Sequence, residues 1–168
     1  MEIRVETADD AAAVARVVEA AFGRPDELRM VEAVRASPGF VPELAFVADD
    51  AGAVVGHVML SWVGLVGSEQ RLLELAPLAV APARQREGIG SALARAALAA
   101  ADARGEPLVL VLGDPRYYVR FGFRRSDTLG IEPPAPAWHA AFMAAPLAAY
   151  DPSLRGKVVF PPSFSLAV

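Results

Sequence analysis

The sequence contains no cysteine and only two histidines among its 168 residues. Without cysteine the chain has no disulfide bond, thiolate zinc site, iron–sulfur cluster or cysteine nucleophile. His57 and His139 lie 82 positions apart and form no HExxH-type motif, so a histidine-rich metal site is not expected. We therefore expect a protein without a bound metal.

Long apolar runs and targeting features are missing as well. No stretch of about 18 uninterrupted apolar residues occurs, and the first ten residues, MEIRVETADD, are acidic. They lack both the basic region and the apolar region of a secretory signal. We expect a cytoplasmic protein with no membrane partner.

Positive charge is scarce overall and unevenly distributed. Sixteen Lys and Arg against 20 Asp and Glu give a net charge of −4, which argues against a nucleic-acid partner because such domains are expected to be basic. Residues 84–125 nevertheless contain eight Arg against four acidic residues. This local excess is compatible with an anionic ligand.

Apolar residues make up 54% of the chain, enough for one self-folding domain over residues 1–168. Apolar spacing within a core of residues 1–125 predicts a short strand, two helices, three antiparallel strands, a long helix, a buried strand and a short helix. The third antiparallel strand spans 71–80 and the long helix 88–103. The wholly apolar strand 108–112, coming after a helix, predicts a parallel or mixed sheet in an α/β fold.

The remaining segment, residues 126–168, is proline-rich near its start and carries one more candidate strand at 157–160. We expect it to be an arm that covers the core and not a second domain. No pattern in the sequence specifies the oligomeric state, and a homodimer is compatible with it.

Gly88 and Gly90 stand at the start of the long predicted helix. Glycines at a helix N-terminus let backbone N–H groups approach an anion, and the helix dipole adds positive charge there. The segment is not a Walker loop, because no Gly-Lys-Ser/Thr follows, and Leu93 occupies the place of the third glycine of a dinucleotide motif. On these residues alone it is either a phosphate-binding turn or an ordinary glycine-rich start of a helix.

Three segments, in order, carry a more specific signal: Leu78–Pro82, Gln85-x-x-Gly88-x-Gly90, and Tyr118-x-x-x-Gly122-Phe123. Together with the element order they resemble the acetyl-CoA-binding core of the GNAT superfamily of N-acetyltransferases. The residues 112–114 and 117–123 are similar to its bacterial YhbS-like branch. The resemblance implies a GNAT acyl-CoA N-acyltransferase fold, with a mixed, mostly antiparallel sheet that is splayed between strands 4 and 5 and flanked by helices.

The resemblance also implies acetyl-CoA as cosubstrate and an amine as acceptor. In this family one strand holds the acetyl carbonyl and the pantetheine arm, and the glycine-containing turn holds the pyrophosphate. Carried over to this sequence, the cofactor-binding residues are Leu78, Ala79, Val80, Gln85, Arg86, Glu87, Gly88, Ile89, Gly90 and Ser91. Pro77 supports the arrangement independently, because a proline cannot donate a ladder hydrogen bond and predicts a bulge or a splayed edge.

Two residues are catalytic candidates by resemblance. Glu74 is similar in position to the catalytic glutamate of the histone-acetylating branch and would accept a proton from the ammonium group; the alternatives are a solvent-facing strand glutamate and a partner for Arg71. Tyr118 matches the family's general-acid tyrosine and would protonate the departing thiolate; the alternative is an aromatic core residue with a satisfied hydroxyl. Tyr117 points about 100° away on a helix, so only one of the pair can face the sulfur.

Other residues carry weaker signals. His57 lies in a predicted strand and is typical of a structural or exposed histidine. Residues suited either to an apolar acceptor wall or to the core are Trp62, Trp138, Phe142 and Met143. Arginines that could meet phosphates or an acidic acceptor, or form a solvated face, are Arg84, Arg86, Arg116, Arg120, Arg124 and Arg125.

These interpretations favour an N-acetyltransferase that moves acetyl from acetyl-CoA to the primary amine of a small molecule, a peptide or a protein. We expect direct attack without a covalent enzyme intermediate, which the absence of cysteine fits. The alternatives are a non-catalytic acyl-CoA-binding or sensing domain and an enzyme with a longer acyl donor. The acceptor is expected to meet the first helices, residues 63–70 and the tail after Ile131, none of which carries an interpretable motif.

Overall fold

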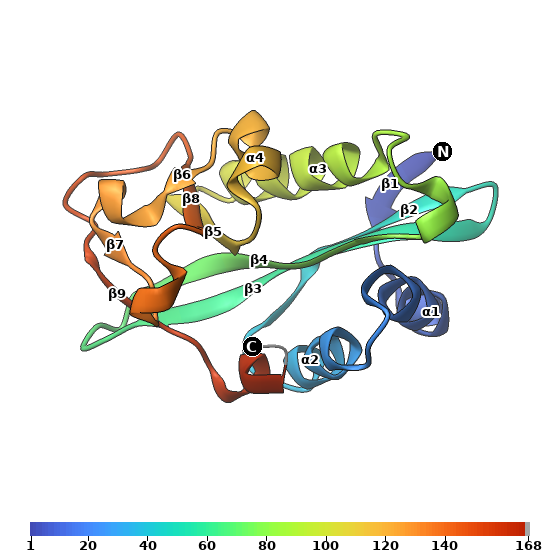
Figure 1. Ribbon diagram of the computed structural model, residues 1–168, viewed down its shortest axis with the longest axis horizontal. Helices are drawn as coiled ribbons and strands as arrows, with labels where there is room; N and C mark the ends of the chain where they lie inside the picture. The colour runs from blue at the N-terminus through green and yellow to red at the C-terminus, as the bar shows by residue number, and fades with distance from the viewer. Residues whose placement is uncertain (167–168) are drawn as a thin grey trace.

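The computed structural model describes residues 1–166 and places a nine-stranded sheet at the centre of the molecule (Figure 1). Along the sheet the strands are β1 (Glu2–Val5), β2 (Phe40–Asp50), β3 (Ala53–Leu65), β4 (Arg71–Val80), β5 (Leu108–Leu112), β8 (Phe142–Pro146) and β6 (Arg124–Arg125). β7 (Ile131–Glu132) pairs with β9 (Gly156–Val159), which also pairs with β3. Neighbouring strands are antiparallel except for the parallel pairs β4–β5 and β7–β9, so the predicted mixed, mostly antiparallel sheet is confirmed.

Helices cover both faces of this sheet. α1 (Ala11–Phe22) and α2 (Asp26–Arg35) lie on one face, and α3 (Ile89–Ala103) and α4 (Pro115–Tyr118) lie on the other (Figure 1). The apolar stripe of α3 packs on the sheet through buried residues such as Leu93 and Ala97. β5 is buried on both faces, in agreement with its wholly apolar sequence. Within the described residues, no helix combines the length and apolar character that crossing a bilayer requires.

Local sequence explains where several elements begin and end. α1 ends at Gly23, which adopts a left-handed conformation with φ of 68° that a residue with a side chain rarely adopts. α4 begins after Asp114, whose carboxylate accepts a hydrogen bond from the Arg116 backbone N–H, with Pro115 at the first helical position. A 3₁₀ turn (Val119–Phe121) continues α4 to Gly122, where the predicted short helix ends.

β4 carries the irregularity that Pro77 predicts. Val58 pairs with Leu78 and Leu60 with Leu75, so the single residue between them on β3 faces two residues of β4. On the other side, β4 pairs with β5 only at Leu73–Val109 and at Glu74–Leu110 within the described part of the chain. The two strands separate after Glu74, which confirms the predicted splay between strands 4 and 5.

The segment after residue 125 contributes more to the sheet than its sequence pattern indicates. β8 pairs with β5 along all five residues of both strands, although residues 142–146 were expected only to be apolar. β9 falls within one residue of the strand predicted at 157–160. A final 3₁₀ helix, η6 (Pro162–Leu166), packs beside α2, where Phe164 shares a buried cluster with Met30.

Candidate functional site

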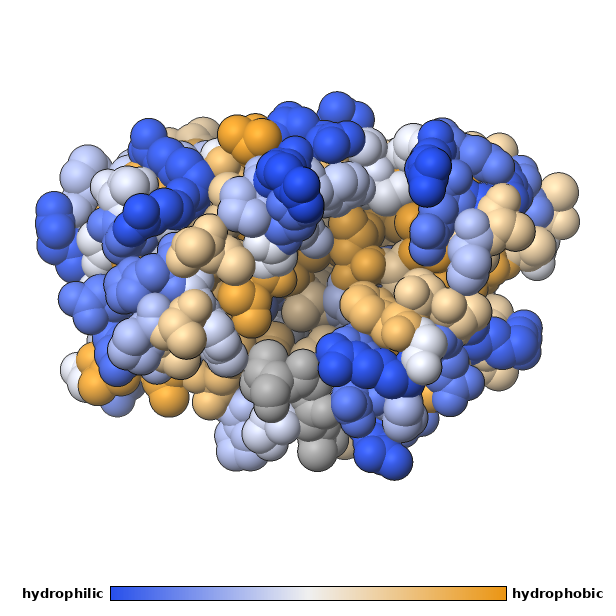
Figure 2. All heavy atoms as spheres, viewed as in Figure 1, coloured by the Kyte–Doolittle hydropathy of each residue, from blue (hydrophilic) through white to orange (hydrophobic). Residues whose placement is uncertain are grey.

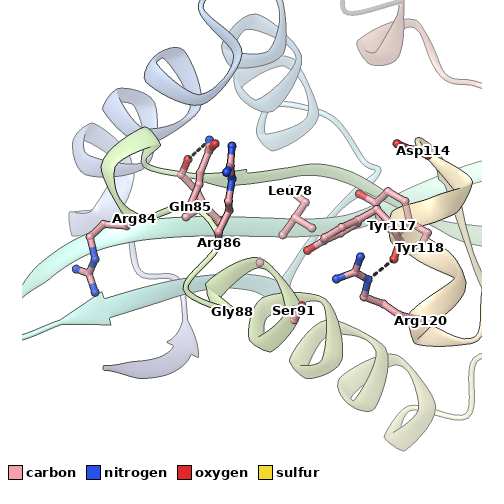
Figure 3. A pocket seen from close by; sticks show the side chains of 12 residues that line it. Leu78, Arg84, Gln85, Arg86, Gly88, Ser91, Asp114, Tyr117, Tyr118 and Arg120 are labelled. Carbon is pink, nitrogen blue, oxygen red and sulfur yellow. Dashed lines mark hydrogen bonds between the residues drawn. The ribbon is translucent and has the colours of Figure 1, made fainter.

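A cavity of about 680 Å³ lies between the end of β4, the start of α3 and α4 (Figure 3). Its lining combines the glycine-containing turn with side chains from all three elements. The lining residues are Leu78, Val80, Arg84, Gln85, Arg86, Gly88, Gly90, Ser91, Asp114, Tyr117, Tyr118 and Arg120. We call this the first cavity.

The turn that leads into α3 exposes backbone donors to the first cavity. Arg86 and Gly88 have positive φ angles of 67° and 84°, and such alternation turns successive N–H groups toward one side. Among the described residues, the N–H groups of Arg86, Glu87 and Gly88 have no hydrogen-bond partner. The first N–H groups of α3 are free as well, as in any helix. These donors and the dipole of the 15-residue helix suit a phosphate group.

Side chains hold this turn in place. The guanidinium of Arg84 bonds Asp50 of the β2–β3 hairpin and Glu87 of the same turn, each at 2.8 Å. The side-chain amide of Gln85 donates to the backbone carbonyl of Val80 at 3.1 Å. Arg84 is therefore engaged in ion pairs and points away from the other lining residues (Figure 3).

Gly90 makes room for an aromatic side chain of α4. A Cβ at Gly90 would lie 2.7 Å from the hydroxyl oxygen of Tyr117, so this hydroxyl reaches across to the first turn of α3. Arg120 lies over the Tyr117 ring at 4.6 Å and donates to the Tyr117 carbonyl at 2.8 Å. Tyr117 and Arg120 thus bound the first cavity on the side opposite β4.

The structure brings seven of the ten predicted cofactor-binding residues to the first cavity: Leu78, Val80, Gln85, Arg86, Gly88, Gly90 and Ser91. The other three do not line it. Ala79 is buried against α1, Ile89 at the start of α3 is buried against the sheet, and Glu87 is exposed and paired with Arg84. Alternation along β4 explains Ala79, because its neighbours on either side point to the opposite face.

A second cavity, of about 410 Å³, adjoins the first at the point where β4 and β5 separate. The two cavities share Leu78, Asp114 and Tyr118. The rest of its lining comes from α1, α2, β4, β5 and the C-terminal segment, and consists of Phe22, Arg24, Glu27, Met30, Glu74, Leu75, Ala76, Pro77, Leu112, Gly113, Phe160 and Phe164. Figure 2 shows a recess near the middle of this face, with hydrophobic residues inside it.

Glu74 is the buried acid of the second cavity. Its residue exposure is 1%, and burial raises the pKa of its carboxyl to about 8, opposed by a hydrogen bond from the Leu112 backbone N–H. Its Oε2 atom has no hydrogen-bond partner within the described residues. Ser61, directly opposite on β3, also has an unpartnered buried hydroxyl. The solvent-facing alternative for Glu74 is therefore wrong, and Arg71 stacks on Trp62 instead.

Tyr118 stands where the two cavities meet. Its ring packs edge-on against Tyr117 and Phe123, with centroids 5.1 and 5.5 Å away. Burial raises the pKa of the Tyr118 hydroxyl, and the neighbouring Tyr117 and Glu74 raise it further. The phenol therefore keeps its proton at neutral pH and can donate it.

Most of the other candidates lie away from both cavities. His57 is fully buried, and burial, with a smaller effect of Arg35, lowers its pKa to about 3, so its ring is neutral; Nδ1 lies 3.3 Å from Glu6. Trp62, Trp138, Phe142 and Met143, considered for an acceptor wall, line neither cavity and pack in or against the core. Of the candidates Arg116, Arg120, Arg124 and Arg125, only Arg120 lines the first cavity; Arg116 and Arg125 pair with Asp114 and Asp127.

Several lining residues of the second cavity escaped the sequence analysis. Phe22, Arg24 and Glu27 belong to the expected first helices and their connection, and Phe160 and Phe164 belong to the expected tail, whereas residues 63–70 do not contribute. Only the spacing of aromatic residues in the tail, interpreted as a cavity wall instead of core, could have indicated Phe160 and Phe164.

The fold and a glycine-containing turn suited to a phosphate group together define a class of proteins. Comparison with known proteins identifies the class. Residues 42–125 match the family model of the acetyltransferase (GNAT) domain. The chain is 31% identical over 156 residues to the uncharacterized N-acetyltransferase YhbS of Escherichia coli K12, covering 93% of this chain and 92% of YhbS. It is 32% identical over 155 residues to the uncharacterized N-acetyltransferase YjhQ of the same strain, covering 89% and 86%. The chain belongs to the GNAT family of N-acetyltransferases.

Solved structures agree with this assignment. The crystal structure of E. coli YhbS in complex with CoA superposes with a TM-score of 0.89 at 29% identity, covering 98% of this chain and 91% of that one. A GNAT family acetyltransferase from Brucella melitensis in complex with acetyl-CoA gives a TM-score of 0.80 at 33% identity, with 97% of each chain covered. The expected resemblance to the YhbS-like branch is thereby confirmed.

Proposed function

We propose that this protein transfers the acetyl group of acetyl-CoA to the primary amine of a small molecule, peptide or protein, by direct attack of the amine on the thioester. The observation that carries the proposal is the junction of the two cavities. The first cavity offers hydrogen-bond donors for a phosphate group, the second offers a buried acid, and Tyr118 lines both. A donor and an acceptor bound on either side would meet at Leu78 and Tyr118.

The first cavity fits acetyl-CoA by its own chemistry. The unpaired N–H groups of Arg86, Glu87 and Gly88, at the N-terminus of α3, suit the pyrophosphate. The separation of β4 from β5 leaves backbone groups of β4 near Leu78 free to bond the pantetheine arm and to polarise the acetyl carbonyl. When bound, acetyl-CoA supplies an activated acetyl group whose leaving group is a thiolate.

Two side chains would move protons. An alkylammonium with a pKa of about 10 is not nucleophilic at neutral pH until it loses a proton. Glu74 is buried in the second cavity with a pKa of about 8, so a useful fraction is ionised near pH 7 and can accept that proton. Tyr118 holds its proton and would give it to the departing sulfur.

The experiment that tests the donor site is a calorimetric titration with acetyl-CoA and with CoA. We expect saturable binding by the wild-type protein and none by Gly88→Glu, which places a carboxylate where the pyrophosphate would lie. Gly67→Glu is the matched control, because Gly67 also has a positive φ, of 70°, with open space around it, and lies away from the cavity.

Binding lost in Gly88→Glu and retained in Gly67→Glu would support the first cavity as the acetyl-CoA site. A folded wild-type protein that binds neither thioester nor CoA would refute the proposed function. Where binding is found, release of free thiol in the presence of a set of primary amines then measures transfer.

A further inference from the structure

The second cavity has an apolar wall with little free charge. Phe22, Met30, Phe160 and Phe164 come from α1, α2 and the C-terminal segment and face the same space as Pro77 and Leu78 of β4. Such a wall favours an apolar ligand body, because burying a CH₂ group away from water contributes about 0.8 kcal/mol. Its volume of about 410 Å³ lies in the range of small-molecule sites.

The carboxylates of this cavity are already engaged. Both oxygens of Glu27 accept hydrogen bonds from Arg24, Nε lying 3.1 Å from each of them and Nη2 2.5 Å from Oε1. Both oxygens of Asp114 accept from the side chain of Arg116. Their negative charges are compensated before any ligand enters.

The one remaining carboxyl is the acid at the reaction point. Glu74 holds its proton in most molecules at pH 7, because burial raises its pKa to about 8. In the ionised fraction, a single ammonium group placed beside Glu74 can give its proton to the carboxylate. A second ammonium group would find no free carboxylate among the described lining residues and would be desolvated without a partner.

We propose that the acceptor is a primary monoamine with an aliphatic or aromatic body and no second charge, and that the Arg24–Glu27 ion pair excludes polyamines by neutralising Glu27. This inference rests on the proposed function and narrows it to one substrate class. Arg24 is a specificity-determining residue in this scheme, because it acts by occupying a carboxylate that would otherwise attract a cation.

The test compares three acceptors with the same six-carbon chain: hexylamine, 1,6-diaminohexane and 6-aminohexanoate. We expect kcat/KM at saturating acetyl-CoA to be about tenfold or more higher for hexylamine than for either charged analogue. An equal or higher kcat/KM for the diamine would overturn the proposal. An equal or higher kcat/KM for 6-aminohexanoate, whose carboxylate could bind the exposed guanidinium of Arg24, would also overturn it. A lysine-containing peptide preferred over hexylamine would do the same.

A pair of variants tests the role of the ion pair. Arg24→Gln leaves Glu27 charged and unpaired, so the preference should shift toward 1,6-diaminohexane by about tenfold. The double variant Arg24→Gln, Glu27→Gln removes both charges and should restore the wild-type preference. An unchanged ratio in the single variant would show that the ion pair does not set selectivity. Arg24 is 55% exposed, and the affinity for acetyl-CoA checks that each variant is folded.

Failure of this inference and failure of the proposed function give different results. Transfer to the diamine, the amino acid or the peptide in preference to hexylamine refutes only the monoamine class. Binding of acetyl-CoA without transfer to any of the four acceptors refutes the monoamine class, and only the absence of transfer to the whole set of primary amines refutes the transferase function.

Discussion

Glu74 of β4 and Tyr118 of α4 both line the second cavity, where β4 and β5 separate. Burial raises the pKa of both side chains and so favours their protonated forms. For Glu74 the shift ends near pH 8, within reach of physiological pH. For Tyr118 the shift moves the pKa further above neutral pH. The same physical cause therefore prepares one residue to exchange a proton and the other to keep one until a strong base forms beside it.

Replacing Tyr118 by Phe removes the hydroxyl and leaves the ring packing. We expect kcat to fall about 100-fold, because positioned general acids contribute roughly 10²- to 10⁴-fold, with the acetyl-CoA Kd changed less than twofold. Steady-state kinetics and calorimetry measure the two quantities. The same substitution at Tyr117 is the control and should affect kcat much less. A Tyr118→Phe enzyme with unchanged kcat would mean that no acid is needed there.

Glu74→Gln should change the pH dependence of the reaction. In the wild type, log(kcat/KM) should rise with pH up to about 8 and then level off, because the ionised Glu74 takes the proton of the bound ammonium. In the variant it should go on rising toward the pKa of the amine itself, about 10. Profiles measured from pH 6 to 9 with one amine test this. Parallel profiles would rule out Glu74 as the base.

The same carboxyl should make stability depend on pH. The folded protein holds the Glu74 proton up to about pH 8, whereas the unfolded chain releases it near the ordinary value of 4.5. Stability therefore falls as pH rises between 4.5 and 8. The Tm difference between Glu74→Gln and wild type should therefore increase as pH rises across this window. The corresponding change in the free energy of unfolding is at most a few kcal/mol, since one pKa unit is about 1.4 kcal/mol. A constant Tm difference would contradict the raised pKa.

At the scale of elements, α3, whose N-terminus carries free backbone N–H groups, packs closely on the sheet at Gly56. A Cβ at Gly56 of β3 would lie 2.8 Å from Leu93 and 3.1 Å from Ile89 of α3. α3 therefore approaches β3 too closely for a side chain at this position. This close contact determines how far the N-terminus of α3 lies from the sheet.

Gly56→Ala should lower the free energy of unfolding by about 1–3 kcal/mol, the usual cost of overpacking a core. Urea denaturation measures it. Adding Leu93→Ala should remove part of the clash, so the double variant should lose less than the sum of the two single losses. Strict additivity would mean that the two residues do not share the contact.

Elements that depend on local pattern were predicted closely, and elements that depend on distant partners were not. The bounds of β4 and β5 match the prediction, because Arg71 and Val80 enclose a β-rich run and residues 108–112 are wholly apolar. β8 has the sequence FMAAP, whose two alanines and proline carry little strand signal. Its pairing with β5 and β6 makes it a strand.

The site divides in the same way. The first cavity follows a motif whose glycines and helix start are adjacent in sequence, so most of its residues could be named in advance. The second cavity joins Phe22 and Glu27 to Phe164, which is separated from them by most of the chain and meets them because η6 packs beside α2. No local spacing encodes that meeting.

At the scale of the whole molecule, the C-terminal segment closes the second cavity. A chain ended after residue 160 should keep the sheet and lose the wall formed by Phe164. We expect KM for the amine to rise about tenfold, since a buried Phe side chain contributes about 1.5–3 kcal/mol, with the acetyl-CoA Kd nearly unchanged. The full-length variant Phe164→Leu, which keeps most of the apolar surface, is the control. Equal loss of both affinities would indicate general unfolding.

The position of β8 also has a consequence for synthesis of the protein. β5 contributes the sequence LVLVL to the middle of the sheet, and its outer edge is covered only by residues 142–146. Until the ribosome has released those residues, a nascent chain carries an apolar strand with an open edge, the kind of surface that pairs with other chains. Slow translation or premature termination between residues 112 and 142 should therefore yield aggregates.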